Sequence, residues 1–175
     1  MKKRMKKGVI NHLARRKKIL IVYYSRTGNT EKVASVLAKH LNAKKEKILD
    51  SENRGGFRGY LKSGAEAAWK SLPAIQLSRK KLENYDIIVI GTPVWSWNMA
   101  SPVRTYLTMN KFKFKQTAFF CTMGGSGSKM AFNSMQKLAG KPISTLELNA
   151  KEVSKINHSA KLKEFIQKLK KAREV

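Results

Sequence analysis

Apolar runs and amphipathic stretches alternate along the chain. The runs at residues 19–24 and 86–91 are almost continuously apolar, which is the pattern of strands buried on both faces of a parallel sheet. Further strands are predicted at 46–49, 117–122 and 144–148. The chain therefore offers five strands, of which 46–49 is the weakest.

Residues at helical spacing follow these strands. Val33, Val36, Leu37 and Leu41 predict a helix that begins at Thr30, because they fall on one face of a 3.6-residue period. Similar spacing predicts helices at 54–72 and 102–109, a helix with Ala131, Met135 and Leu138 inward, and a terminal helix that carries Leu162, Phe165, Ile166 and Leu169. In the helix at 54–72, Trp69 shares a face with apolar residues and is expected in the core.

Five alternations of strand and helix predict a doubly wound α/β sandwich with right-handed crossovers. In such a fold, ligands bind outside the carboxyl ends of the strands. Three polar loops, at 25–30, 92–101 and 123–128, follow strands. We therefore expect all three loops at one edge of the sheet and read the chemistry from them.

The length and composition of the chain fit a single domain, and its net charge is strongly positive. The chain has 175 residues, 42% of them hydrophobic, and a net charge of +26, which favours an anionic partner or ligand. We expect a basic N-terminal extension at 1–16 and a folded domain at 17–175. Nine Lys or Arg residues lie within 1–18 without an acid, so this segment is either a solvated tail or an anchor to nucleic acid or anionic lipid.

Location follows from what the sequence lacks. No apolar run is long enough to cross a membrane, and the basic start lacks the apolar segment of a secretory signal. Cys121 is the only cysteine, which fits a reducing compartment. The expected location is cytoplasmic.

The first loop has the chemistry of a phosphate site. It offers the hydroxyls of Ser25, Thr27 and Thr30, the Asn29 amide and a turn at Gly28 before a helix. Backbone N–H groups and the dipole at the start of a helix favour an anion there. The same residues also occur in an ordinary turn and helix cap.

The other two loops favour a planar ligand. Trp95 and Trp97 lie close together beside a proline, where we expect exposed indoles on which a ring can stack. The alternative is that they fill a subunit contact. The Gly124–Gly125 segment permits close main-chain approach to the edge of a heterocycle.

Several other sites are excluded or disfavoured. No Gly-Lys-Ser/Thr motif follows the first loop, and the third loop lacks the last glycine of a dinucleotide fingerprint. Cys121 lacks the arginine that a cysteine phosphatase would place at the position of Gly127, so it is expected to be a buried strand residue. Tyr23 and Tyr24 occupy the positions where a receiver domain needs carboxylates. No spacing indicates a metal site.

Taken together, residues 17–172 resemble the flavodoxin family. Residues 24–30 resemble that family's FMN phosphate loop, residues 91–102 the loop that packs on the isoalloxazine ring, and residues 122–128 the loop at the flavin edge. The resemblance implies a five-stranded parallel sheet in the order 2-1-3-4-5 and noncovalent FMN. The implied cofactor-binding residues are Ser25, Arg26, Thr27, Gly28, Asn29, Thr30, Thr92, Pro93, Val94, Trp95, Ser96, Trp97, Asn98, Thr122, Met123, Gly124, Gly125 and Gly127.

The resemblance implies electron transfer or flavin-dependent reduction of small acceptors such as a quinone. Its partners would be a redox protein or NAD(P)H, and an NAD(P)H:quinone oxidoreductase is one alternative. The positive charge departs from electron-carrying flavodoxins, which are typically acidic, and favours an acidic partner surface. A basic binding module on nucleic acid or anionic lipid is the other alternative.

Overall fold

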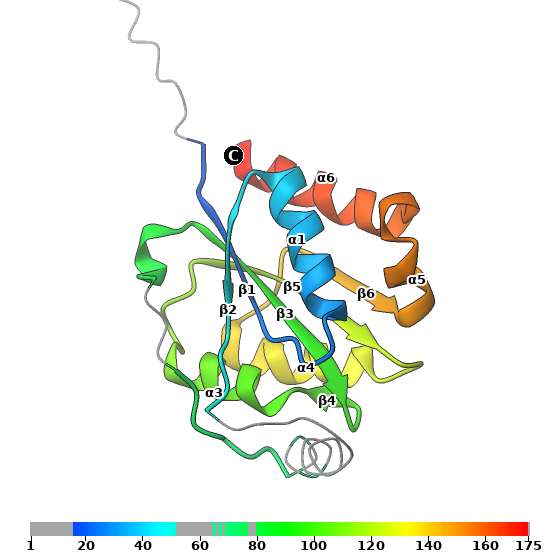
Figure 1. The fold of residues 1–175 in the computed structure, drawn as a ribbon. Helices are drawn as coiled ribbons and strands as arrows, with labels where there is room; N and C mark the ends of the chain where they lie inside the picture. The colour runs from blue at the N-terminus through cyan, green and yellow to red at the C-terminus, as the bar shows by residue number, and fades with distance from the viewer. Residues whose placement is uncertain (1–15, 52–64, 66, 68, 77–79, 175) are drawn as a thin grey trace, which may run out of the picture.

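A central sheet between two layers of helices forms the structure, a computed structural model that describes residues 16–51, 65, 67, 69–76 and 80–174 (Figure 1). Five strands, β1 (Ile19–Tyr23), β2 (Lys44–Lys47), β3 (Ile87–Trp95), β5 (Gln116–Met123) and β6 (Thr145–Asn149), pair in parallel in the order β2-β1-β3-β5-β6. This is the predicted 2-1-3-4-5 order, so the fold prediction is confirmed.

Two apolar cores hold the layers together. On one face of the sheet, α1 (Asn29–Leu41), α5 (Ala150–Ser154) and α6 (Ala160–Glu174) bury Leu37, Val153 and Phe165 against the strands. On the other face, α3 (Ser101–Met109) and α4 (Ser128–Ala139) bury Leu107 and Met135. The central strands β1, β3 and β5 are therefore covered on both sides, as their continuous apolar sequences predict.

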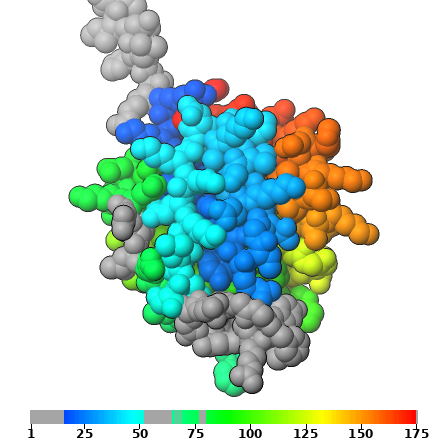
Figure 2. Space-filling view, viewed as in Figure 1, coloured from blue at the N-terminus to red at the C-terminus, as the bar shows by residue number. Residues whose placement is uncertain are grey.

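The edge strand β2 is short and charged. Its four residues are Lys44, Lys45, Glu46 and Lys47, and it pairs with β1. The expected strand at 46–49 is thus displaced by two residues. Charged side chains on an edge strand hinder pairing with another chain, and Figure 2 shows β2 and α1 together on the surface of the molecule.

A two-residue strand, β4 (Asn98–Met99), was not expected. It pairs antiparallel with the end of β3, where Val94 faces Met99 and Trp95 faces Asn98. The first half of the predicted loop at 92–101 is therefore strand. The turn between these strands consists of Ser96 and Trp97 alone.

The predicted helix at 54–72 lies mainly outside the described residues. Trp69, which we expected in the core, is described and is 86% exposed, so that prediction is wrong. Ala67, two residues earlier, is fully buried in the core beneath α3 and α4. The side of this segment that packs in the core is therefore the one that carries Ala67, and not the one that carries Trp69.

A close approach between β3 and β5 fixes their packing. Gly91 faces Phe120 across the ladder, and a Cβ atom on Gly91 would lie 2.0 Å from Cζ of that ring. Phe120 is fully buried, so the ring has little room to move.

Gly91→Ala should therefore lower the free energy of unfolding by about 1–3 kcal/mol, the usual cost of overpacking a core. Chemical denaturation of the wild-type protein and the variant measures this loss. Gly125→Ala is the matched control, since a Cβ there meets no atom within 4 Å. Adding Phe120→Leu to Gly91→Ala should recover part of the loss; equal losses in Gly91→Ala and Gly125→Ala would contradict the close approach.

Candidate functional site

The first loop connects β1 to α1 through a left-handed glycine. Gly28 has φ +92° and precedes the first residue of α1, a conformation that glycine adopts without steric cost. Its N–H donates to Ser25 Oγ at 3.1 Å, and its carbonyl accepts from Lys32 N–H at 2.9 Å. The next N–H groups, at the start of α1, have no acceptor inside the helix by its geometry, and Thr27, Gly28 and Asn29 are exposed.

A buried hydroxyl pair joins the first loop to the third. Thr30 Oγ1 and Thr122 Oγ1 lie 2.8 Å apart, and both residues are buried. They come from the start of α1 and the end of β5, so this hydrogen bond fixes the two loops side by side. Beyond it, Gly124 and Gly125 are exposed, and a Cβ on either would meet no atom within 4 Å. Their backbone therefore borders open space.

The second loop is a tight hairpin with two left-handed residues. Ser96 has φ +44° and Trp97 has φ +57°, values that two-residue hairpins require and that asparagine and glycine usually supply. The third loop packs against this turn, because a Cβ on Gly127 would lie 2.9 Å from the Trp97 Cα. Since Gly127 itself has φ +106°, glycine is required there for both reasons.

The two indoles of the hairpin have different surroundings. Trp95 is only 8% exposed and meets the Tyr24 ring edge to face, with the centroids 5.5 Å apart. Its predicted exposure is wrong, because β3 continues through it and turns its side chain into the core. Trp97 is 60% exposed, as predicted.

Thr92 holds the second loop from inside. Its side chain is fully buried, and its hydroxyl accepts from Ala100 N–H at 2.9 Å and donates to the Pro93 carbonyl at 2.9 Å. The hydroxyl thus anchors the start of α3 beneath the hairpin. Of the other predicted residues, Pro93, Val94 and Asn98 are half-buried and Ser96 is exposed.

The carboxylate of Glu31, at the start of α1, is paired with a lysine and a tyrosine. Glu31 accepts from Lys47 Nζ at 2.8 Å and from the Tyr23 hydroxyl at 3.0 Å. The Lys47 hydrogen bond, with a further one from Tyr23, holds the pKa of Glu31 below its usual value against the opposing effect of burial. The sequence indicated Glu31 only as an acid in a first helical turn; its partners come from two other strands.

Cys121 is buried in β5, as expected. Burial, with the nearby Glu147 charge, raises the pKa of its thiol to about 12. The thiol is therefore protonated near neutral pH and is a poor nucleophile.

Comparisons with known proteins identify the family of this chain. A flavodoxin family model matches residues 18–169. The chain belongs to the flavodoxin family. The chain is also similar to a flavoprotein from Lactobacillus acidophilus crystallised in complex with FMN, with 31% identity over 79% of this chain and 97% of that one and a TM-score of 0.67.

Two further structures extend the comparison. The apo-form of the flavoprotein from Lactobacillus acidophilus, solved by NMR, shares 30% identity with a TM-score of 0.58 and covers 79% of this chain and 96% of that one. An oxidised flavodoxin from Bacillus cereus shares 16% identity with a TM-score of 0.52, covering 87% of this chain and 97% of that one. At that identity the second likeness concerns the fold alone.

The Glu31 network predicts a pH-dependent stability. Because the pKa of Glu31 is lowered on folding, its contribution is present above the unfolded pKa, near 4.3, and is lost as the pH falls through the folded pKa. Glu31→Gln should therefore destabilise the protein at neutral pH, by a fraction of a kcal/mol for a pair this exposed.

Denaturation of both proteins between about pH 7 and pH 3 measures the difference. The difference in free energy of unfolding between the wild-type protein and Glu31→Gln should shrink as the pH falls, because a protonated glutamate resembles glutamine. Tyr23→Phe should reduce the difference by removing one donor to the carboxylate. A difference that is constant with pH would contradict the network.

Proposed function

We propose that this protein binds FMN noncovalently at the carboxyl edge of the sheet and uses it for electron transfer or for the reduction of small acceptors. The observation that carries the proposal is the convergence of three loops on one edge, tied by the Thr30–Thr122 hydrogen bond and the approach of Gly127 to Trp97. Family membership and the relative crystallised with FMN support it.

The donor set of the first loop fits a phosphate. Thr27 and Asn29 are exposed beside the free N–H groups of α1, and the half-buried Arg26 adds a positive charge to the same loop. Ser25, Gly28 and Thr30 shape the loop from within through the hydrogen bonds described above. Because Lys47 and Tyr23 compensate Glu31, its carboxylate opposes a bound dianion less than an unpaired acid would.

The second and third loops fit a flat ring system. The exposed Trp97 offers an indole face, while Gly124 and Gly125 leave their main chain open to polar groups on a ring edge. Trp95, Thr92 and Thr122 support these loops from the core. Bound FMN would supply the redox chemistry, and the protein would orient the ring and control the access of water and acceptors.

An NAD(P)H:quinone oxidoreductase is the more specific candidate within this proposal. The net charge of +26 favours it, since a pyridine dinucleotide carries negative phosphates that a basic protein attracts. The same charge favours an acidic surface on any protein partner.

FMN titration tests the phosphate loop. Removing a hydroxyl that donates to a charged group costs about 1.5–3 kcal/mol, so Thr27→Ala should weaken FMN roughly tenfold to a hundredfold while riboflavin binding changes little. Ser126→Ala, an exposed hydroxyl in the third loop, is the control. Equal losses for FMN and riboflavin would place the phosphate elsewhere.

Tryptophan substitution tests the ring contact. Trp97→Ala should lower the affinity for riboflavin and FMN alike and relieve the quenching of flavin fluorescence, because it removes an exposed stacking surface. Trp95→Phe should preserve quenching, since Trp95 packs on Tyr24 in the core. Unchanged quenching in Trp97→Ala would exclude this indole from the site.

Rapid mixing separates the two redox roles. The FMN-loaded protein should lose its flavin colour with NADH or NADPH in a single turnover and recover it on addition of a benzoquinone. The NAD(P)H step should slow as salt is added, because screening weakens the attraction of an anionic donor, whereas reoxidation by the uncharged benzoquinone should depend little on salt. Loss of colour only with a protein donor would instead assign the carrier role.

A further inference from the structure

The opposite edge of the sheet, where the strands begin, carries a separate concentration of positive charge. We define the amino-edge surface by the described basic residues around the starts of β1, β3, β5 and β6 and the end of α6. They include Arg16, Lys17, Lys18, Lys80, Lys81, Lys111, Lys113, Lys115, Lys141 and Arg173. Around them lie three acids, Glu83, Asp86 and Glu174.

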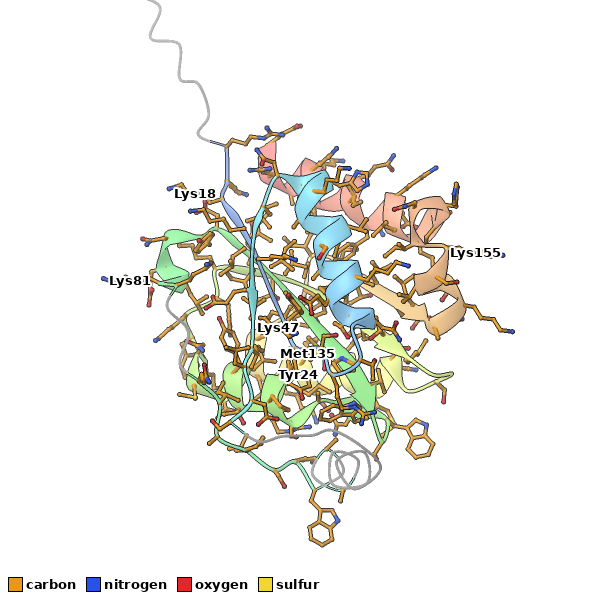
Figure 3. The ribbon with its side chains drawn as sticks, in the orientation of Figure 1. Lys18, Tyr24, Lys47, Lys81, Met135 and Lys155 are labelled. Carbon is orange, nitrogen blue, oxygen red and sulfur yellow. The ribbon has the colours of Figure 1, made fainter. Side chains whose placement is uncertain are left out.

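Hydrogen bonds show that these segments are neighbours in space. Lys115 Nζ donates to the Glu83 carbonyl at 3.0 Å and lies 3.3 Å from Asp86 Oδ1. Lys17 Nζ donates to Gln116 Oε1 at 3.4 Å, which joins the start of β1 to the start of β5. Figure 3 places Lys18 and Lys81 at this end of the sheet, far from Tyr24 at the other end.

An exposed aromatic residue lies in the turn that precedes β5, between two lysines of this surface. Phe112 is 91% exposed, and Met109 nearby is 51% exposed. Lys111 and Lys113 flank the ring in sequence, with Lys111 Nζ 5.1 Å from its centroid. An exposed apolar residue inside a basic surface is the combination that peripheral proteins present to an anionic membrane.

The backbone of this turn is strained. Lys113 N–H donates to the Asn110 carbonyl at 3.0 Å, which closes a four-residue turn. Phe112 is the third residue of that turn and has φ +73°, where glycine or asparagine is usual. A bulky residue there costs stability, and its exposed ring gains no burial in return; such costs concentrate at functional sites.

We propose that the amino-edge surface docks on an anionic lipid membrane and that Phe112 inserts into the headgroup region. The lysines would pair with lipid phosphates and carboxylates. A hollow of about 540 Å³ that includes Lys18, Lys44 and Arg173 in its lining could receive one such group. None of the described helices is long and apolar enough to cross a membrane.

A nucleic acid is the less suitable partner for this surface. Single-strand binders follow the backbone along a basic groove and stack bases on aromatic rings, whereas Phe112 lies in an exposed turn three residues after the exposed Met109. The proposed orientation also leaves the three loops at the carboxyl edge directed away from the lipid. Membrane attachment and access to the candidate FMN site are therefore compatible.

Vesicle sedimentation tests the proposal with the full chain. Binding is measured on phosphatidylcholine vesicles with and without about one third phosphatidylserine. The protein should sediment with the anionic vesicles and dissociate at high salt. Phe112→Gly should weaken this binding about tenfold while it raises the denaturation midpoint, because glycine accepts the left-handed conformation.

Matched variants at the other edge serve as controls. Met130→Ser removes an exposed apolar side chain that also follows a lysine, and it should leave vesicle binding unchanged. Lys111→Gln with Lys113→Gln should reduce binding roughly fivefold per lysine, and more than Lys151→Gln in α5 with Lys155→Gln at the C-cap of that helix.

Three results would overturn the inference. One is the absence of binding to anionic vesicles. Another is an equal loss of vesicle binding in the lysine variants of the amino edge and in those of the carboxyl edge. The third is tight, salt-sensitive binding of a DNA oligonucleotide that Phe112→Gly weakens while vesicles are not bound.

Discussion

The parallel pairing of β1 and β5 on either side of β3 determines the rest of the structure. Because all three strands run in the same direction, the loops that follow them open at one edge. The pairing places the Phe120 ring so close to Gly91 that a Cβ atom there has no room. A hydrogen bond between Thr30 and Thr122 then connects the first loop to the third, and one from Ala100 to Thr92 holds the second loop together. The candidate site is thus a consequence of strand order, completed by a few side chains that the core holds in place.

The same directionality separates two kinds of surface. The carboxyl edge presents helix N-termini, hydroxyls and glycines, which suit a phosphate and a flat ring. The amino edge presents lysines and one exposed phenylalanine, which suit a lipid headgroup region. A chain with a net charge of +26 could have spread its positive charge evenly. The turn at Phe112 adds an exposed apolar side chain to the amino edge. The two edges therefore differ in chemistry and can serve different partners without competing for space.

The fold and the chemistry of the loops could be predicted from the sequence because both depend on the order of residues within short segments. The buried strands are continuously apolar, and the residues from Ser25 to Thr30 combine a turn with a helix start. The helix α5 was missed although Asn149 and Glu152 form a capping box, a readable signal, because it has only five residues. Edge strand β2 was misplaced since Lys44 and Lys45 show no apolar alternation.

The tryptophans show where sequence pattern fails. Trp95 lies two residues after Pro93 and directly before Ser96. Its burial depends on β3 continuing past Gly91 into a hairpin whose turn residues, Ser96 and Trp97, are unusual there. Trp69 was assigned to the core by its spacing, yet which face of its segment packs is decided by tertiary contacts. The Glu31–Lys47 pair likewise joins residues from separate elements, and no local pattern encodes it.

The central claim is that the three loops form one site in which the α1 N-terminus receives a phosphate. Amide NMR spectra of the labelled protein, titrated in parallel with FMN and with riboflavin, test it most directly. Both ligands should shift Gly124, Gly125 and the Trp97 indole, whereas FMN alone should shift Asn29, Thr30 and Glu31 strongly, since only FMN carries the phosphate that their N–H groups would bind. Identical shifts for the two ligands at the start of α1, or the largest shifts in the lysine-lined groove between Asn149 and Lys161, would contradict the account.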